Sequence, residues 1–267
     1  MAKLNFVLPI STIYNELPNK FIRKFNTVEQ KSFDKYVPLK IDTIFHSNLS
    51  LTDNNFYNIL NEKNAFDLIK KFNIRRFSFD IGPRFCQTNS IDNKYFGIGN
   101  SLSIKEIYEI CDRKINQLFR DLPNGCKIGI ENLNYYNTGA YEGVCEPAFY
   151  NEICNKFDIE LVLDIPHAQV SAYNKSLDIS KHLHEFVFRR IHEIHISKAK
   201  IIDSFNAIDY HGLPDKLEFT LAQEIIDMNN NDIDVVIEYY GNPSKLIKAY
   251  QTAEKFLNEK ISHYSPT

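Results

Sequence analysis

The sequence lacks tryptophan entirely and has only nine glycines, and none of its five cysteines lies in a CxxC pair. An odd number of isolated cysteines argues against a disulfide framework and against a structural zinc site built from thiolates. No base lies near a cysteine in the sequence, so nucleophilic catalysis by a thiol is not expected either. Unpaired cysteines are typical of proteins in a reducing compartment, and we therefore expect a cytoplasmic protein.

Long apolar runs and an excess of basic charge are also missing. No apolar run approaches the roughly 20 residues that a membrane span requires. The formal net charge is −3, which gives no electrostatic footprint for nucleic acid. The glycine-rich phosphate-binding motifs and the G-x-S-x-G nucleophile elbow are absent as well. We therefore expect neither a membrane nor a nucleic acid as the partner.

What the chain does have is the length and the pattern of one barrel-sized domain. It contains 267 residues, of which 43% are hydrophobic, and no linker or repeat divides it. Strand-like and helix-like segments alternate, which predicts a parallel sheet with crossover helices. We expect a single α/β domain over residues 1–267, of the TIM-type (β/α)8 class, with its functional site at the C-terminal ends of the strands.

The strand count leaves one part of this barrel open. Helical spacing predicts helices over residues 53–72, 103–121, 147–157, 217–229 and 243–259. Seven strands are evident, beginning with residues 4–10, and the eighth would have to come from the irregular stretch 28–41. A complete barrel is the first expectation, and a barrel with an incomplete or irregular N-terminal unit is the second.

Six of the strands end in a residue of a type that binds metals. The segments DTIFH, RRFSFD, KIGIE, ELVLD, RIHEIH and VVIE end at His46, Asp80, Glu131, Asp164, His195 and Glu238. Folding requires apolar residues inside a strand but no His, Asp or Glu at its tip. One carboxylate at a strand end is more often a helix cap or a salt-bridge partner. Six such tips indicate a site, because in an α/β barrel they converge on one face.

Three further candidates follow the tips. His167 comes three residues after Asp164 in LVLDIPHAQ, whereas Asp209 and His211 lie two apart in IDYHG, which we expect to be a glycine-bounded loop. With the tips they make nine oxygen or imidazole ligands without a thiolate, a set that suits Mn, Fe(II) or Zn. Nine ligands are too many for one ion, so we predict two or three ions that share bridging carboxylates.

Other polar residues receive simpler interpretations. Asn132 follows Glu131 and is expected either to hydrogen-bond a ligand carboxylate or to cap the loop. His192 is out of phase with His195, so we expect it to be structural or to face away from the site. Three more histidines are predicted to be solvated surface groups: His182, His184 and His263.

The order of the candidate residues resembles that of a known enzyme family. The series is His46, Asp80, Glu131-Asn132, Asp164-x-x-His167, His195, Asp209-x-His211 and Glu238. It is similar to the series found in the multinuclear non-heme iron-dependent oxidative enzymes. The segments IFHSNLSL, EIHIS and DYHG, and the long central block that begins GIENLNYYNTGAY, resemble segments of that family. The resemblance extends over roughly residues 40–240 and depends on the whole ordered set.

One position departs from the pattern of that family. Where the family usually reads S-x-H on the fourth strand, this chain reads Ser78-Phe79-Asp80. Aspartate still binds iron, but it adds a negative charge and has a shorter reach than histidine. The charge and the geometry of one metal position therefore differ from the family pattern.

The resemblance implies a function as well as a fold. It implies two or three iron ions in mixed Fe(II)/Fe(III) states, with O2 as co-substrate. The implied reaction is oxidation of a cysteine, or of another residue, in a ribosomally made precursor peptide of natural-product biosynthesis. Members often work with a small partner protein that presents the peptide. On this reading all nine candidates are metal ligands, and the expected catalytic residues are Asp80, Asn132 and His195.

Three other functions stay open at this point. A sugar isomerase or epimerase on a related barrel would use carboxylates and one or two divalent ions, but fewer histidines. A tri-zinc phosphodiesterase of the endonuclease IV type has a similar mixture of ligands, although the negative net charge counts against DNA as its substrate. A non-catalytic barrel that binds metal or peptide would account for Asp80 as a mark of lost activity.

Overall fold

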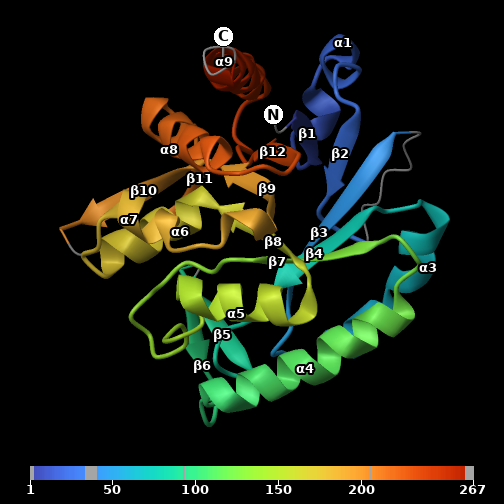
Figure 1. Ribbon diagram of the computed structural model, residues 1–267, viewed down its shortest axis with the longest axis vertical. Helices are drawn as coiled ribbons and strands as arrows, with labels where there is room; N and C mark the ends of the chain where they lie inside the picture. The colour runs from blue at the N-terminus through green and yellow to red at the C-terminus, as the bar shows by residue number, and fades with distance from the viewer. Residues whose placement is uncertain (1–2, 34–40, 93, 205, 262–267) are drawn as a thin grey trace.

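Eight parallel strands close into a barrel in the computed structural model, which describes residues 3–33, 41–92, 94–204 and 206–261 (Figure 1). Around the barrel the order is β1 (Leu4–Ile10), β12 (Ile233–Ile237), β9 (Ile191–Ile196), β8 (Glu160–Asp164), β7 (Lys127–Glu131), β4 (Arg76–Asp80), β3 (Asp42–Ser50) and β2 (Thr27–Gln30). The predicted TIM-type (β/α)8 fold is confirmed, and the barrel is complete.

The strand that the sequence left open is β2. It pairs in parallel with β1 on one side and with β3 on the other, which closes the barrel. All four of its residues are buried, although only Val28 is aliphatic. Polar residues that face the barrel interior hide this strand from a search for apolar runs. Residues 34–40, the end of the irregular stretch, and His263 lie outside the described residues.

The helices follow the predicted order with one clear correction. They are α1 (Asn19–Ile22), α2 (Phe56–Glu62), α3 (Ala65–Lys71), α4 (Ile104–Asp121), α5 (Pro147–Phe157), α6 (Ile165–Asn174), α7 (Ile179–His184), α8 (Lys216–Asp227) and α9 (Pro243–Ile261). The single helix expected over 53–72 is wrong, because Asn64 takes a left-handed conformation (φ 49°) that separates α2 from α3. Among the described helices, none is long and apolar enough to cross a membrane.

Helix α4 shows how local sequence fixes these elements. Ser103 and Glu106 form a reciprocal capping box that supplies hydrogen-bond partners at the first turn. From there, buried residues recur at helical spacing, including Ile107, Cys111 and Leu118. These side chains join the main apolar core, which packs between the barrel strands and the surrounding helices.

Successive side chains of a strand point alternately outward, to the apolar core under the helices, and inward, to the barrel interior. In β4, Phe77 and Phe79 belong to the outer core, whereas Arg76, Ser78 and Asp80 are the alternate residues. Arg76 is buried and its Nη1 donates hydrogen bonds of 2.7 Å to both Glu193 and Asp234. A small apolar group also lies apart from the outer core: Val7, Ile44 and Val236.

Gly129 on β7 makes room for this arrangement. A Cβ atom at that position would lie 3.0 Å from Ser78 Cβ and 3.3 Å from Arg76 Cδ. Because β7 and β4 pair with Gly129 opposite Ser78, any larger residue would press on the side chains of the neighbouring strand. The absent side chain therefore lets an arginine fit within the barrel.

Two hairpins stand outside the barrel. One joins β5 (Thr88–Ile91) to β6 (Lys94–Gly97), and the other joins β10 (Lys198–Asp203) to β11 (Asn206–Gly212). The expected loop at IDYHG is therefore wrong, because Asp209 and His211 lie on strand β11. Helix α6 packs against this second hairpin and ties it to the barrel.

Three described histidines lie outside the candidate site, and they differ in exposure to solvent. His184 is exposed, as predicted. His182 is only 2% exposed, so its prediction as a surface group is wrong. Its ring packs against Phe186 in an edge-on contact. His192 is half-buried and lines a pocket that also contains Arg76 and Asp234, apart from the candidate site.

Candidate metal centre

The predicted residues meet at the C-terminal mouth of the barrel, around a cavity of about 1130 Å³. Seven of the nine line this cavity: His46, Asp80, Glu131, His167, Asp209, His211 and Glu238. The other two, Asp164 and His195, are almost completely buried, at 1% and 0% exposure. Both contact the cavity-lining residues, so the structure brings the whole predicted set together.

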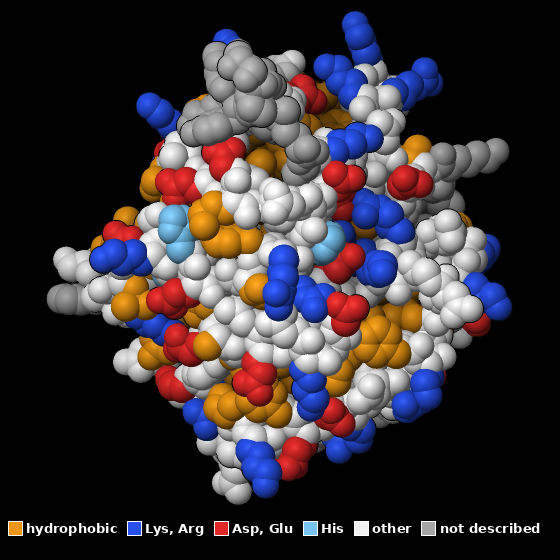
Figure 2. Space-filling model, in the orientation of Figure 1, with side chains coloured by type: hydrophobic (Ala, Val, Ile, Leu, Met, Phe, Trp, Pro, Cys, Tyr) orange, Lys and Arg blue, Asp and Glu red, His pale blue; other side chains and the backbone are white. Residues whose placement is uncertain are grey.

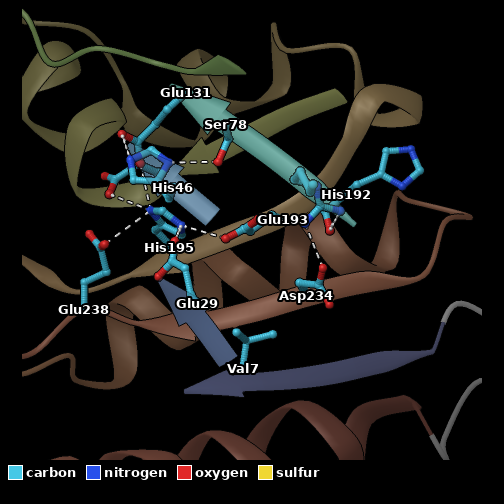
Figure 3. Close-up of polar contacts among 12 residues, drawn as sticks. Val7, Glu29, His46, Ser78, Glu131, His192, Glu193, His195, Asp234 and Glu238 are labelled. Carbon is cyan, nitrogen blue, oxygen red and sulfur yellow. Dashed lines mark hydrogen bonds and ion pairs between the residues drawn. The ribbon is translucent and has the colours of Figure 1, made fainter. Parts of the chain in front are cut away.

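Glu131 holds the middle of this set. Its Oε1 lies 2.7 Å from His195 Nδ1, and its Oε2 lies 3.3 Å from His46 Nε2 (Figure 3). Its two oxygens thus face two separate groups of donors, one with His46 and Asp80 and the other with Asp164 and His195. In each group the donor atoms lie within 4.8 Å of one another, which is close enough to share an ion. Glu131 therefore has the geometry of a bridging carboxylate.

His46 is oriented by a hydrogen bond on its far side. Its Nδ1 lies 3.0 Å from Ser78 Oγ, and the Ser78 hydroxyl donates to the carbonyl oxygen of Phe45. Ser78 Oγ therefore accepts a hydrogen bond from the His46 Nδ1–H group, which leaves Nε2 turned toward Glu131. A metal-binding imidazole usually has this arrangement, with one nitrogen donating to the protein and the other free for the ion.

His167 and His195 repeat the same arrangement. His167 Nδ1 donates to the carbonyl oxygen of Asn132 at 2.7 Å, and its Nε2 faces Asp209. His195 Nε2 lies 3.0 Å from Glu193 and 3.3 Å from Glu29, and its Nδ1 faces the carboxylates of the centre (Figure 3). Three imidazoles thus each turn one nitrogen toward carboxylates of the centre, which is the orientation that metal binding requires.

The β10–β11 hairpin brings the last two ligands to the mouth. Asp209 Oδ2 lies 3.6 Å from His167 Nε2 and 3.0 Å from His211 Nδ1. His211 Nε2 lies 3.4 Å from Glu238 Oε2, which connects the hairpin to the barrel strands. His211 itself has a left-handed conformation, with φ of 49°. The hairpin residues therefore form a third set of donors beside the two that Glu131 joins.

Asn132 acts on the ligands through the backbone. Its amide Nδ2 donates to the carbonyl oxygen of Asp164 at 2.9 Å, and its Oδ1 accepts from the Asp164 backbone N–H at 2.7 Å. Its own carbonyl accepts from His167, as described above. Instead of the expected bond to a carboxylate, Asn132 fixes the chain at the start of α6, where Asp164 caps the helix.

Four functional neighbours were not found from the sequence. They are Glu29, Lys31, Glu193 and Tyr240, all in contact with predicted ligands or with one another. Glu193 could have been found by alternation, because it lies two residues before His195 on the same strand. Glu29 lies on β2, which has no apolar run to reveal it.

Carboxylates dominate the electrostatics of the centre. Seven are in contact within it or directly behind it: Glu29, Asp80, Glu131, Asp164, Glu193, Asp209 and Glu238. Burial and the neighbouring Glu131 raise the pKa of Asp80 to about 7. Burial also raises the pKa of Asp164 to about 7, with His167 opposing the shift and Glu131 adding to it. Both shifts favour the protonated acid, because burial disfavours the charged carboxylate and the neighbouring negative charges add to that effect.

The imidazoles stabilise the other carboxylates in their charged forms. Burial favours neutral Glu131, but His46 and His195 outweigh burial and hold the pKa of Glu131 well below its ordinary value. Asp80 Oδ1 is buried and has no hydrogen-bond partner among the described residues. A surplus of carboxylates, a buried carboxylate oxygen without a partner and imidazole nitrogens turned toward carboxylates fit divalent cations, which replace protons when they bind such ligands.

Comparison with known protein families agrees with this geometry. Residues 104–257, more than half of the chain, match the family described as RiPP precursor modification enzyme MbnB/TglH/ChrH. The chain belongs to this family. Seven of the nine candidate ligands lie inside the matched segment, and His46 and Asp80 precede it. No functionally curated protein matches the sequence.

Solved structures share the fold of this family member but little of its sequence. A xylose isomerase domain-containing protein from Salmonella typhimurium has a TM-score of 0.65 at 9% identity, over 95% of this chain and 97% of that one. D-psicose 3-epimerase from Clostridium cellulolyticum has a TM-score of 0.62 at 11% identity, over 97% and 99%. A family 2 AP endonuclease from Brucella melitensis has a TM-score of 0.61 at 14% identity, over 92% and 97%. These likenesses establish the TIM-barrel fold alone.

Proposed function

We propose that this family member is a multinuclear non-heme iron oxidase that uses O2 to modify a cysteine, or another residue, of a ribosomally made precursor peptide. The family supports an enzyme acting on a peptide precursor. The observation that carries the proposed metal chemistry is Glu131, whose two carboxylate oxygens face different donor groups. A bridging carboxylate of this kind suits two ions, and the hairpin donors suit a third.

The nine residues divide naturally among three positions in this proposal. His46, Asp80 and Glu131 would hold the first ion, and Asp164, His195 and Glu238 would hold the second together with Glu131. His167 and two residues of the hairpin would hold a third: Asp209 and His211. When bound, iron supplies Lewis acidity and one-electron chemistry toward O2. The mixture of imidazole and carboxylate, without thiolate, is compatible with iron in both oxidation states.

The chain itself contributes orientation. Ser78, Glu193 and Asn132 keep three imidazole rings turned toward the centre. Asp80 lines the cavity beside Glu131, where its carboxylate would bind the first ion and face the substrate. These roles account for the proposed catalytic residues Asp80, Asn132 and His195, the last as a ligand that two carboxylates hold in place.

The cavity suits a peptide side chain rather than a small sugar alone. Five tyrosines line it: Tyr14, Tyr95, Tyr141, Tyr210 and Tyr240. Tyrosine presents an apolar ring with a polar tip, so these side chains pack against a peptide while donating hydrogen bonds. On the face seen in Figure 2, acidic and basic side chains are intermixed. A small partner protein that presents the peptide belongs to the same proposal.

The proposal is tested by metal analysis followed by reaction. Protein purified without oxygen should contain about two to three iron ions per chain, as a shared multinuclear site requires. Addition of O2 and of a short cysteine-containing peptide encoded beside the gene should change the mass of that peptide, and fragmentation should place the change at the cysteine. Glu131→Gln protein, incubated identically, should leave the peptide unchanged.

Two results would count against this function. Stoichiometric zinc without iron, together with phosphodiester hydrolysis, would favour the phosphodiesterase alternative. Epimerisation of a ketose in the presence of Mn²⁺, with the peptide left unmodified, would favour the sugar-enzyme alternative.

A further inference from the structure

A lysine ammonium lies at one end of the metal centre, between two of its carboxylates. Lys31 Nζ is 3.0 Å from Glu29 Oε1 and forms a closer ion pair with Glu238 Oε1. The Lys31 side chain is only 17% exposed, and the carboxylates of Glu29 and Glu238 are 0% and 6% exposed. The three groups are therefore largely shielded from water, where an ion pair is strong and an unpaired charge is costly.

The position of this ammonium coincides with a place for a metal ion. Glu29, His195 and Glu238 form one of the groups whose donor atoms lie within 4.8 Å of one another. Figure 3 shows Glu29 and Glu238 reaching the His195 ring from different strands. The ammonium pairs with an oxygen of both carboxylates in that group. Lys31 thus supplies the positive charge that a metal ion would otherwise provide there.

The same Glu238 oxygen serves several partners. Glu238 Oε1 accepts from Tyr240 at 3.0 Å, pairs with Lys31, and lies 3.6 Å from His195 Nδ1. His195 Nδ1 also faces Glu131, so an ion held by these three residues would approach Glu238 Oε1. An ammonium and a divalent cation cannot both occupy the space beside that oxygen without strong repulsion.

We propose that Lys31 is a built-in competitor for metal at the Glu238 side of the centre. Metal binding there displaces the ammonium, and Glu29 then becomes an additional carboxylate for the ion. Lys31 consequently stabilises the protein before metal is loaded and weakens the binding of metal afterwards. The inference rests on the proposed function only in assuming that Glu131, His195 and Glu238 bind metal, and it requires neither O2 nor peptide.

Substitution of the ammonium gives the first test. Lys31→Met retains the length of the side chain but removes its charge. In competition titrations against a chelator, this variant should bind Zn²⁺ at least about tenfold more tightly than the wild type. Its melting temperature without metal should fall, and Zn²⁺ should raise that temperature by more than it does in the wild type. Lys31→Arg, which keeps the charge, should resemble the wild type in both measurements.

A double substitution isolates the role of Glu29. If the carboxylate of Glu29 joins the metal once the ammonium is gone, Lys31→Met/Glu29→Gln should lose most of the gain in Zn²⁺ affinity. Equal affinity in the single and double variants would overturn this part of the inference.

A measurement on the wild-type protein removes any dependence on how the variants fold. Amine acetylation followed by peptide mass spectrometry should show several-fold more labelling of Lys31 after Zn²⁺ is added, because the ammonium is released. Lys105, whose side chain is 87% exposed, serves as the control and should be labelled equally with and without Zn²⁺. Unchanged or reduced labelling of Lys31 would overturn the inference.

The outcome separates this inference from the proposed function. If Glu131→Gln binds Zn²⁺ as the wild type does, the metal centre itself is misassigned. If Glu131→Gln loses Zn²⁺ but Lys31→Met binds it no more tightly than the wild type, the centre stands and the competitor role of Lys31 is wrong.

Discussion

Glu193 and His195 lie two residues apart on β9, and the Glu193 carboxylate meets His195 Nε2 at 3.0 Å on the side opposite the metal centre. The other oxygen of Glu193 accepts from Arg76 at 2.7 Å. Although burial opposes it, contact with His195 and Arg76 lowers the pKa of Glu193 to about 2, so the carboxylate stays charged. The Arg76 guanidinium thus orients the Glu193 carboxylate, and this carboxylate orients the His195 imidazole, which we propose as a metal ligand.

This relationship predicts the effect of Glu193→Gln. The amide keeps the shape of the side chain but holds the His195 ring less firmly, so metal affinity should fall by about 10–100-fold. Chelator competition with Zn²⁺ measures the change. Glu160→Gln is the matched control, because Glu160 also pairs with Arg76, at 2.6 Å, but has no contact with His195 among the described interactions. Equal losses in both variants would mean that the fold, rather than the ring, had been disturbed.

The shared position of Glu131 predicts an unequal loss of metal. Glu131→Gln should remove more than one ion per chain, because its two oxygens face two donor groups. His167→Ala should remove about one, since it serves only the hairpin position. Metal analysis after identical anaerobic loading compares the two. Loss of the same amount from both variants would contradict a bridging role for Glu131.

Asp80 occupies the position at which the family usually has histidine, so restoring histidine there tests whether this position binds metal. Asp80→His replaces a carboxylate that repels Glu131 with a neutral imidazole, and Ser78 is already in the S-x-H pattern. The variant should retain its metal, whereas Asp80→Ala should lose about one ion per chain. Metal analysis distinguishes them. A variant Asp80→His that loads less metal than Asp80→Ala would show that the aspartate suits its position better than histidine.

Asp80 and Asp164 also predict the pH dependence of the protein without metal. The pKa of each is raised from an ordinary value of 3.8 to about 7. Between about pH 4 and pH 7 the folded state therefore binds more protons than the unfolded state, and stability is lost as the pH rises through this window. Metal affinity should change in the opposite direction, rising toward pH 8 as the carboxylates become available.

Melting temperature and Zn²⁺ affinity, each measured from pH 5 to about pH 8, test these opposite trends. Asp80→Asn should reduce both slopes, because one of the two titrating acids is removed. A melting temperature that rises over this range without metal would contradict the raised pKa values.

Tyr250 links the first and last strands of the barrel, and we expect its hydrogen bonds to contribute to the free energy of unfolding. Its buried hydroxyl accepts from the Ile237 N–H at 3.1 Å and donates to the carbonyl oxygen of Val7, so it ties β12 to β1. Tyr250→Phe should lower the free energy of unfolding by about 1–3 kcal/mol, because two buried polar groups lose a partner. Urea denaturation measures this. Tyr173→Phe, which removes an exposed hydrogen bond to Asp203, should have a much smaller effect.

Sequence alone predicted the barrel and the nine candidate ligands, because both leave periodic signals. An apolar run that leads to His46 or Glu131 is visible whatever its partners are, although the strand expected to end at His46 continues to Ser50. The neighbours that orient the ligands leave no such signal. Glu29 belongs to a strand of mostly polar residues that pairs with β1 and β3, and Lys31 directly follows that strand. The break between α2 and α3 depends on one left-handed asparagine, which helical spacing does not reveal.

The candidate ligands lie on structural elements of two kinds, the barrel strands and the β10–β11 hairpin. Those at strand tips cannot move without moving the barrel, whereas Asp209 and His211 are carried by a two-stranded ribbon that packs mainly on α6. In the proposed centre, changes confined to this peripheral hairpin would alter the donors of the third ion and leave the barrel with the donors of the other two. The third position is then the modular part of the proposed site, because one hairpin carries two of its three donors.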